Sequence, residues 1–195
     1  MQIMNSIDLK FDGPFTFIGE WDSVFQSSLA KSSGIYLWTV RQRNDSTHLI
    51  HYVGETVSFV KRHKEHLIQI LGLNYGIFDA EKAQVGVCEL IWSGLWRDKS
   101  SDAPLKLIKA YETIHEEVVH YLSILNIFFA ELETASSMRK HIEGCIGWNL
   151  RNNHPKSKAL YPDDNYVGTM KEKNNGELLI SSTERIQGLD SRILY

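Results

Sequence analysis

The stretch that decides the fold is GIYLWTVRQRNDSTHLIHYVG at residues 34–54, followed at 55–67 by ETVSFVKRHKEHL. Two segments rich in aromatic and β-branched residues flank the polar run RQRNDST, and this pattern predicts a β-hairpin. The apolar spacing after the hairpin predicts a helix from about residue 58 to residue 71. Arg62 and His66 stand one turn apart at the border of its apolar face, so we expect both side chains beside the hairpin.

The predicted register of the hairpin brings aromatic side chains and bare backbone together. A turn centred on Asn44 places Tyr36 opposite Tyr52. The same register pairs Gly34 with Gly54. Because side chains alternate along a strand, both phenols and both glycines then lie on one face of the sheet. Such a face allows a bulky group to approach the backbone closely.

The composition is that of an ordinary globular protein, which we interpret as a single domain over residues 1–195. Apolar residues make up 43% and charged residues 23% of the chain, which excludes disordered and fibrous classes. The order of expected elements predicts an α+β fold with a small, mainly antiparallel sheet that contains the hairpin and is flanked by helices. The other elements that we expect are a helical segment at 20–31, helices at 105–122 and 137–150, a buried strand at 126–133 and a second hairpin formed by 165–170 and 177–182.

Charge and cysteine usage restrict the classes of function. The net charge of −3 argues against indiscriminate coating of nucleic acid, although basic residues gather at 61–64 and 138–158. No apolar run is long enough to span a bilayer, so we expect a cytosolic protein without a membrane partner. Cys88 and Cys145 lie far apart outside any C-x-x-C pattern, which indicates reduced thiols.

The spacing of the two tripeptides carries a family resemblance. GIY at 34–36 is followed after fifteen residues by YVG at 52–54, then by Arg62 and His66, and late in the chain by IEGCIG at 142–147. In these motifs the chain resembles the GIY-YIG nuclease family, with valine replacing isoleucine in the second tripeptide. The resemblance implies hydrolysis of DNA phosphodiester bonds with one divalent ion.

The same resemblance assigns roles to five residues. Glu143 would be the only protein ligand of a Mg²⁺ or Mn²⁺ ion, with water and phosphate oxygen completing the shell. Arg62 would contact the scissile phosphate through its planar guanidinium. Tyr36 would accept the proton of the attacking water, with Tyr52 and His66 setting its protonation. His66 is an alternative base, because a free phenol with a pKa near 10 is rarely ionised at pH 7.

The family's late asparagine has three candidates, Asn149, Asn152 and Asn153, of which we choose Asn153. The resemblance divides the chain into a catalytic core at 33–155, an N-terminal extension at 1–32 and a C-terminal hairpin extension at 156–195.

Other interpretations are weaker or remain open. The histidines of HEEVVH at 115–120 are five residues apart, so they do not share the helix face that the H-E-x-x-H zinc motif needs. His63 and His66 lack further ligands to complete a zinc site. A module that keeps the fold but only binds nucleic acid or protein is the alternative function. The oligomeric state is left open, a homodimer included.

Overall fold

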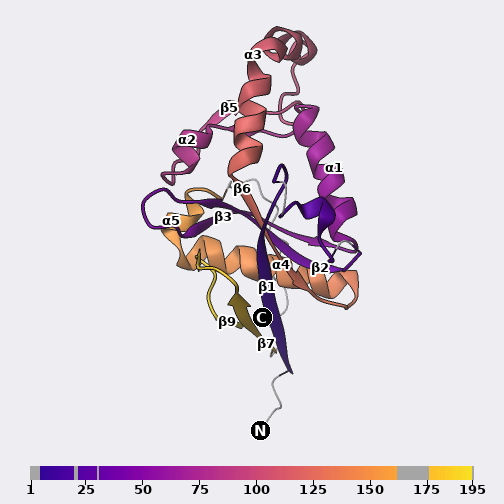
Figure 1. Cartoon of the computed structure of the whole chain (residues 1–195), viewed down its shortest axis with the longest axis vertical. Coiled ribbons are helices and arrows are strands. Elements are labelled where there is room, and N and C mark those ends of the chain that lie inside the picture. The colour runs from indigo at the N-terminus through magenta and orange to yellow at the C-terminus, as the bar shows by residue number, and fades with distance from the viewer. Residues whose placement is uncertain (1–4, 20–21, 30, 162–175, 195) are drawn as a thin grey trace.

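A computed structural model describes residues 5–19, 22–29, 31–161 and 176–194 (Figure 1). The helices are η1 (Val24–Gln26, a 3-10 turn), α1 (Phe59–Leu71), α2 (Ala80–Ala83), α3 (Ala103–Ile124), α4 (Ser136–Asn153) and α5 (Pro155–Lys158). The strands are β1 (Asn5–Thr16), β2 (Gly34–Arg41), β3 (His48–Thr56), β4 (Ile77–Phe78), β5 (Leu90–Trp92), β6 (Leu125–Glu131), β7 (Gly176–Ser182), β8 (Ile186–Gln187) and β9 (Arg192–Leu194).

The centre of the molecule is a curled, mixed sheet of seven strands in the order β8-β3-β2-β6-β1-β7-β9. Strands β1 and β7 run parallel, as do β3 and β8, whereas the remaining neighbours are antiparallel. Of the strands in the described residues, only β4 and β5 lie outside this sheet, as a separate two-stranded ribbon. The expected small, mainly antiparallel sheet is therefore wrong, and the fold is a mixed α/β architecture built on a large sheet.

The difference comes from the two ends of the chain, which both join the central sheet. Strand β1 pairs with β7 through residues 5–11 and with β6 through residues 12–16, with an irregularity between Asp12 and Phe15. The segment 177–182 was expected to form a local hairpin, but it lies against β1 and β9 instead. Its expected partner at 165–170 lies outside the described residues. Parallel pairing between segments so far apart leaves no local sequence signal, because only local turns reveal a hairpin.

The predicted hairpin of β2 and β3 is present, but its register differs from the prediction by two residues. Tyr36 pairs with Gly54, and Trp38 pairs with Tyr52. A bulge after Trp38 leaves His51 as an extra residue in β3 and shifts the pairing. A shift of two residues keeps side chains on the same face, so the predicted sharing of a face is unaffected.

Helices cover both faces of the sheet. Figure 1 shows α1, α2 and α3 on one side and α4 across the other. On the first side Tyr36 and Trp38 pack with Phe59 of α1, and on the second Ile35 and Leu37 pack with Ile142 of α4. The alternation of β2 between two cores explains its continuous apolar sequence. In the part of the chain that the structure describes, no helix has the length and apolarity needed to cross a membrane.

The helical segment expected at 20–31 is reduced to the single turn η1. Ser23 Oγ accepts a hydrogen bond from the backbone N–H of Phe25 at 3.3 Å, and Ser27 Oγ accepts one from Leu29 at 3.1 Å. Ser27 itself has an extended backbone. These hydroxyls compete with helical hydrogen bonds for the backbone, which explains why apolar spacing alone misled the prediction.

The role of β7 in the central sheet predicts unequal costs for two neighbouring leucines. Leu178 is fully buried and Leu179 is 40% exposed. Leu178→Ala should lower the free energy of unfolding by about 2–5 kcal/mol, and Leu179→Ala by less than about 1 kcal/mol. Urea denaturation of both variants measures the difference. Equal, small effects would contradict the placement of β7 in the core.

Candidate functional site

The first element of the site is the close packing of Tyr36 on Gly54. The Tyr36 side chain has 0% exposure, and its ring lies over the backbone of its pairing partner on β3. A Cβ atom built on Gly54 would lie 2.3 Å from both Cζ and Oη of Tyr36. Glycine is therefore required at this position, because any side chain would displace the phenol.

The Tyr36 hydroxyl meets two side chains of α1. Tyr36 Oη lies 2.7 Å from Nε2 of His66, and Arg62 Nε donates to the same oxygen at 3.4 Å. Arg62 also reaches Glu65 with Nη1 at 3.3 Å, and its side chain is 38% exposed. Since the predicted helix follows the hairpin after a short connection, the spacing of 62 and 66 by one turn places both groups on the same phenol.

Tyr52 completes the aromatic part of the cluster. Its ring centroid lies 5.9 Å from that of Tyr36 and 5.9 Å from that of His66. Burial raises the pKa of Tyr36 well above its ordinary value, Tyr52 raises it further, and the Arg62 charge opposes both. Burial also raises the pKa of Tyr52, followed by the negative charge of Glu143, and Arg62 again opposes. Both phenols are therefore protonated at neutral pH.

Burial keeps His66 neutral. Besides Tyr36, it contacts Tyr75, a tyrosine that the sequence analysis did not assign to the site. Tyr75 Oη lies 3.2 Å from Nδ1 of His66, so each ring nitrogen of the histidine meets one tyrosine. Burial and, to a smaller extent, the positive charge of Arg62 together lower the pKa of His66 to about 2. Tyr75 follows α1 in a loop whose path the sequence did not reveal, so its aromatic character was the only available signal.

A fixed hydrogen-bond chain supports the cluster from behind. The backbone carbonyl of Phe59 can only accept, so Nδ1 of His63 donates to it at 2.8 Å. Nε2 of His63 is then free to accept from Trp38 Nε1 at 3.2 Å. The Trp38 ring packs edge-on against His66 with centroids 4.7 Å apart. His63, rejected above as a metal ligand, thus holds the packing around the candidate site.

Glu143 approaches the aromatic cluster from the other side of the sheet. It lies on α4, which packs against β3. Beyond Leu49, no described strand pairs with the outer edge of β3. The Glu143 charge raises the pKa of both Tyr36 and Tyr52, and Arg62 lowers the pKa of Glu143. The open edge of β3 therefore brings groups from both faces of the sheet into electrostatic contact.

A second carboxylate that the sequence did not predict stands beside Glu143. Burial and, to a smaller extent, the negative charge of Glu55 together raise the pKa of Glu143 to about 7. Glu55 accepts from Arg139 Nε at 2.9 Å and from Ser136 at 3.4 Å, so its own charge is compensated. An acidic residue inside a strand directly after YVG was a usable signal, because strands are poor in glutamate.

The residues near Glu143 fit a divalent ion held by one carboxylate. Among the described residues no group of three or more His, Cys, Asp or Glu side chains gathers in metal-binding geometry. Glu143 nevertheless has the donor chemistry that Mg²⁺ prefers, and Mg²⁺ is commonly held by one carboxylate plus water and phosphate oxygens. The repulsion from Glu55 disfavours the Glu143 anion, and a cation beside Glu143 would remove that penalty.

The structure places Asn153 apart from the other five predicted residues. It follows Glu143 by ten residues on α4, about 15 Å along the helix axis. Its side-chain amide donates to the Asn149 side chain, and the Asn149 amide donates to Asp190 at 2.8 Å. Asn152 donates to the carbonyl of Trp148 in its own helix. The hydrogen bonds of the three asparagines thus stabilise the end of α4 and its contact with the segment before β9.

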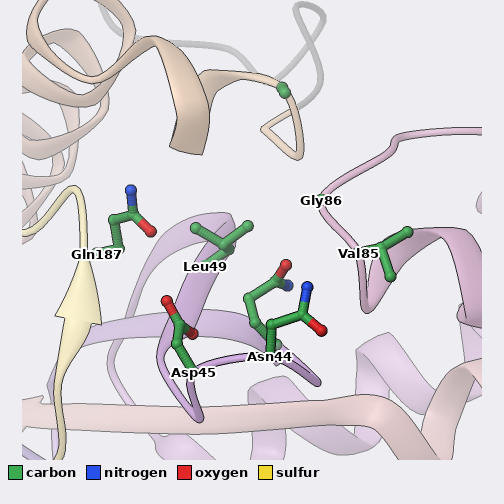
Figure 2. Close-up of a pocket in the computed structure, with 8 residues that line it drawn as sticks. Asn44, Asp45, Leu49, Val85, Gly86 and Gln187 are labelled. Atoms are coloured by element: carbon green, nitrogen blue, oxygen red, sulfur yellow. The ribbon is translucent and has the colours of Figure 1, made fainter.

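A separate hollow lies at the turn of the hairpin, away from this cluster. Figure 2 shows Asn44, Asp45 and Leu49 of the hairpin facing Val85 and Gly86 across it. Its volume is about 290 Å³, and Gln187 of β8 also lines it. None of the six predicted site residues lines this hollow. The titratable cluster at the open edge of β3 is therefore the candidate functional site.

Comparison of the chain with protein-family models, with curated proteins and with solved structures found no match.

Three histidines are buried on the face of the sheet that α1, α2 and α3 cover, and we expect them to make the stability of the protein depend on pH. Burial lowers the pKa of His51 and of His63 to about 4 and that of His66 to about 2. Below about pH 6.5 the unfolded chain binds protons that the folded chain does not, so the free energy of unfolding falls by up to about 1.4 kcal/mol per pH unit for each histidine. Glu143 has the opposite effect, because its pKa is raised in the folded chain, which therefore binds a proton more readily than the unfolded chain does. On acidification this gain in stability cancels roughly the loss from one histidine.

Urea denaturation between about pH 7 and about pH 5 should therefore show a net loss of stability on acidification. His120→Gln is the matched control, because the His120 side chain is 44% exposed, and it should leave the slope almost unchanged. A flat profile would contradict the neutral, buried state of these histidines.

Proposed function

We propose that this chain is a metal-dependent endonuclease that hydrolyses DNA phosphodiester bonds, in the manner implied by its resemblance to the GIY-YIG nucleases. The observation that carries the proposal is the convergence of Tyr36, Tyr52, Arg62 and His66 beside Glu143 at the open edge of β3. Four of these groups have pKa values displaced by burial and by one another. Such clusters of perturbed groups are typical of catalytic sites.

Arg62 is the residue suited to bind the scissile phosphate. Its side chain is partly exposed, whereas Tyr36 and His66 are buried behind it. Its guanidinium can form two parallel hydrogen bonds to phosphate oxygens and stays charged at any relevant pH. When Arg62 turns from Tyr36 and Glu65 towards a phosphate, it also uncovers the Tyr36 hydroxyl for the attacking water.

Tyr36 and His66 together form a proton relay. With its proton on Nδ1, His66 donates to Tyr75 and accepts from the Tyr36 hydroxyl through Nε2. Tyr36 would then take the proton of the attacking water and pass its own proton to His66. Burial and Arg62 together hold the pKa of His66 at about 2, so His66 accepts this proton only once Arg62 has turned to the phosphate. Because His66 lies behind Tyr36, the two alternative bases act in series. The positive charge of Arg62 favours the phenolate character that develops on Tyr36.

Glu143 would hold the Mg²⁺ or Mn²⁺ ion. An ion held by Glu143 would supply Lewis-acid chemistry there, polarising a phosphoryl oxygen and stabilising a departing oxyanion. Glu55, held by Arg139, lies beside Glu143 and raises the pKa of Glu143, a penalty on the Glu143 anion that a bound cation would relieve. We place the protein in the cytoplasm, a compartment that keeps buried cysteines such as Cys145 reduced.

Supercoiled plasmid incubated with the purified protein and Mg²⁺ or Mn²⁺ tests the proposal. We expect nicked or linear product that disappears with chelator and in Glu143→Ala, because the variant loses the only carboxylate assigned to the ion. Glu133→Ala, which removes an exposed carboxylate after β6, is the matched control and should cut like wild type. Intact plasmid with folded wild-type protein, together with retained DNA binding, would favour the binding module instead.

Replacement of Arg62 by lysine tests whether phosphate binding needs only the positive charge of Arg62 or also its planar pair of donors. Arg62→Lys keeps the positive charge but loses the planar pair of donors, so cleavage should fall by about 100-fold or more. Arg43→Lys, at the hairpin turn, is the control of the same chemical type and should keep full activity. Gel-based cleavage rates give the comparison, and near-normal activity of Arg62→Lys would remove Arg62 from the phosphate.

A further inference from the structure

Helix α3 is apolar on two sides roughly 120° apart, which a helix packed against one core does not need. Its inner side contributes the buried Ile114 and Val118 to the first core. Its outer side exposes Leu105, Ile108 and Val119, and Ile108 is 68% exposed. Figure 1 shows α3 standing upright at the end of the molecule away from α4. A helix with apolar residues all round is normally covered on every side.

The outer residues follow the spacing of a helix-pairing seam. The members of this seam, separated by three and four residues in alternation, are Leu105, Ile108, Glu112, His115 and Val119. All five are exposed. Alternating steps of three and four keep residues on one stripe of a helix over several turns, as in the core positions of a coiled coil. The inner residues named above do not belong to this stripe.

The charges of α3 favour an antiparallel copy of the same helix as the occupant. Basic residues lie in its first half and acidic residues in its second half; they are Lys106 and Lys109, then Glu112, Glu116 and Glu117. A parallel copy would align like charges, whereas an antiparallel copy aligns unlike charges. Lys106 already forms ion pairs with Asp98 and Asp102. Lys109 and Glu116, beside the seam, form none with a described side chain.

We propose that the outer seam of α3 binds a second copy of this chain, with the two helices antiparallel about a two-fold axis. Ile108 then faces Val119 of the second copy, and Glu112 faces its His115. Lys109 lies beside Glu116 of the second copy, and two-fold symmetry repeats every contact. The seam is thus self-complementary, with apolar contacts at both ends and a polar pair at the centre.

The mass of the protein in solution tests the seam without reference to any activity. Light scattering after size-exclusion chromatography should give a dimer for wild type and a monomer for Ile108→Asp, which places a charge in the apolar contact. Ile68→Asp is the matched control, because Ile68 on α1 is 65% exposed, and it should remain a dimer. A wild-type monomer across a series of micromolar concentrations, or a dimer of Ile108→Asp, would overturn the proposal.

A charge exchange tests the antiparallel orientation. Lys109→Glu alone and Glu116→Lys alone each replace both intermolecular attractions by repulsions, so each should self-associate at least about tenfold more weakly than wild type. An equimolar mixture of the two variants restores both attractions and should form the heterodimer. The two positions are seven residues apart, about 10 Å along one helix, so rescue within a single chain is excluded. A mixture that associates no better than the separate variants would overturn the orientation.

Discussion

The packing of the Tyr36 ring on Gly54 is the constraint on which the rest of the site depends. Because Gly54 has no side chain, the phenol lies flat against the hairpin and is fully buried beneath α1. Its hydroxyl cannot be left unpaired there, since an unsatisfied buried polar group costs about 1–3 kcal/mol. His66 and Arg62 satisfy it from one turn of α1. The pairing of two strands thus fixes the rotation of the helix that follows them.

The same constraint sets the charge states of the cluster. Burial disfavours every ionised form, so the phenols and His66 are neutral, and Arg62 is the charged group at their border. The hydrogen bonds of His63 to Trp38 and Phe59 hold the packing without any charge. A fully hydrogen-bonded network that excludes water is rigid, because breaking any bond leaves a buried polar group without a partner. This rigidity fixes the orientation of the Tyr36 hydroxyl.

The sequence pattern predicted the elements of this fold that form from residues close together in the chain. The hairpin, α1, α3, β6 and α4 follow from periodicity, and the bulge after Trp38 altered the register without changing the face of Tyr36. The size of the sheet escaped prediction because β7 pairs with β1 from the other end of the chain. Glu55 and Tyr75 were missed for a related reason. Their contacts depend on the open edge of β3 and on the path of a loop, neither of which has a signature in sequence.

Glu143 is the feature that stability alone does not explain. Its carboxylate is partly buried beside Glu55, and its pKa is raised to about 7, so ionising it at neutral pH costs free energy that a neutral residue would avoid. The nearby Arg139 compensates Glu55 instead. A fold selected only for stability would place an apolar or amide side chain on this border of α4. No described side chain forms an ion pair with this carboxylate. Under the proposed function a bound cation would explain its position, and Arg62 would contact the phosphate that accompanies the cation.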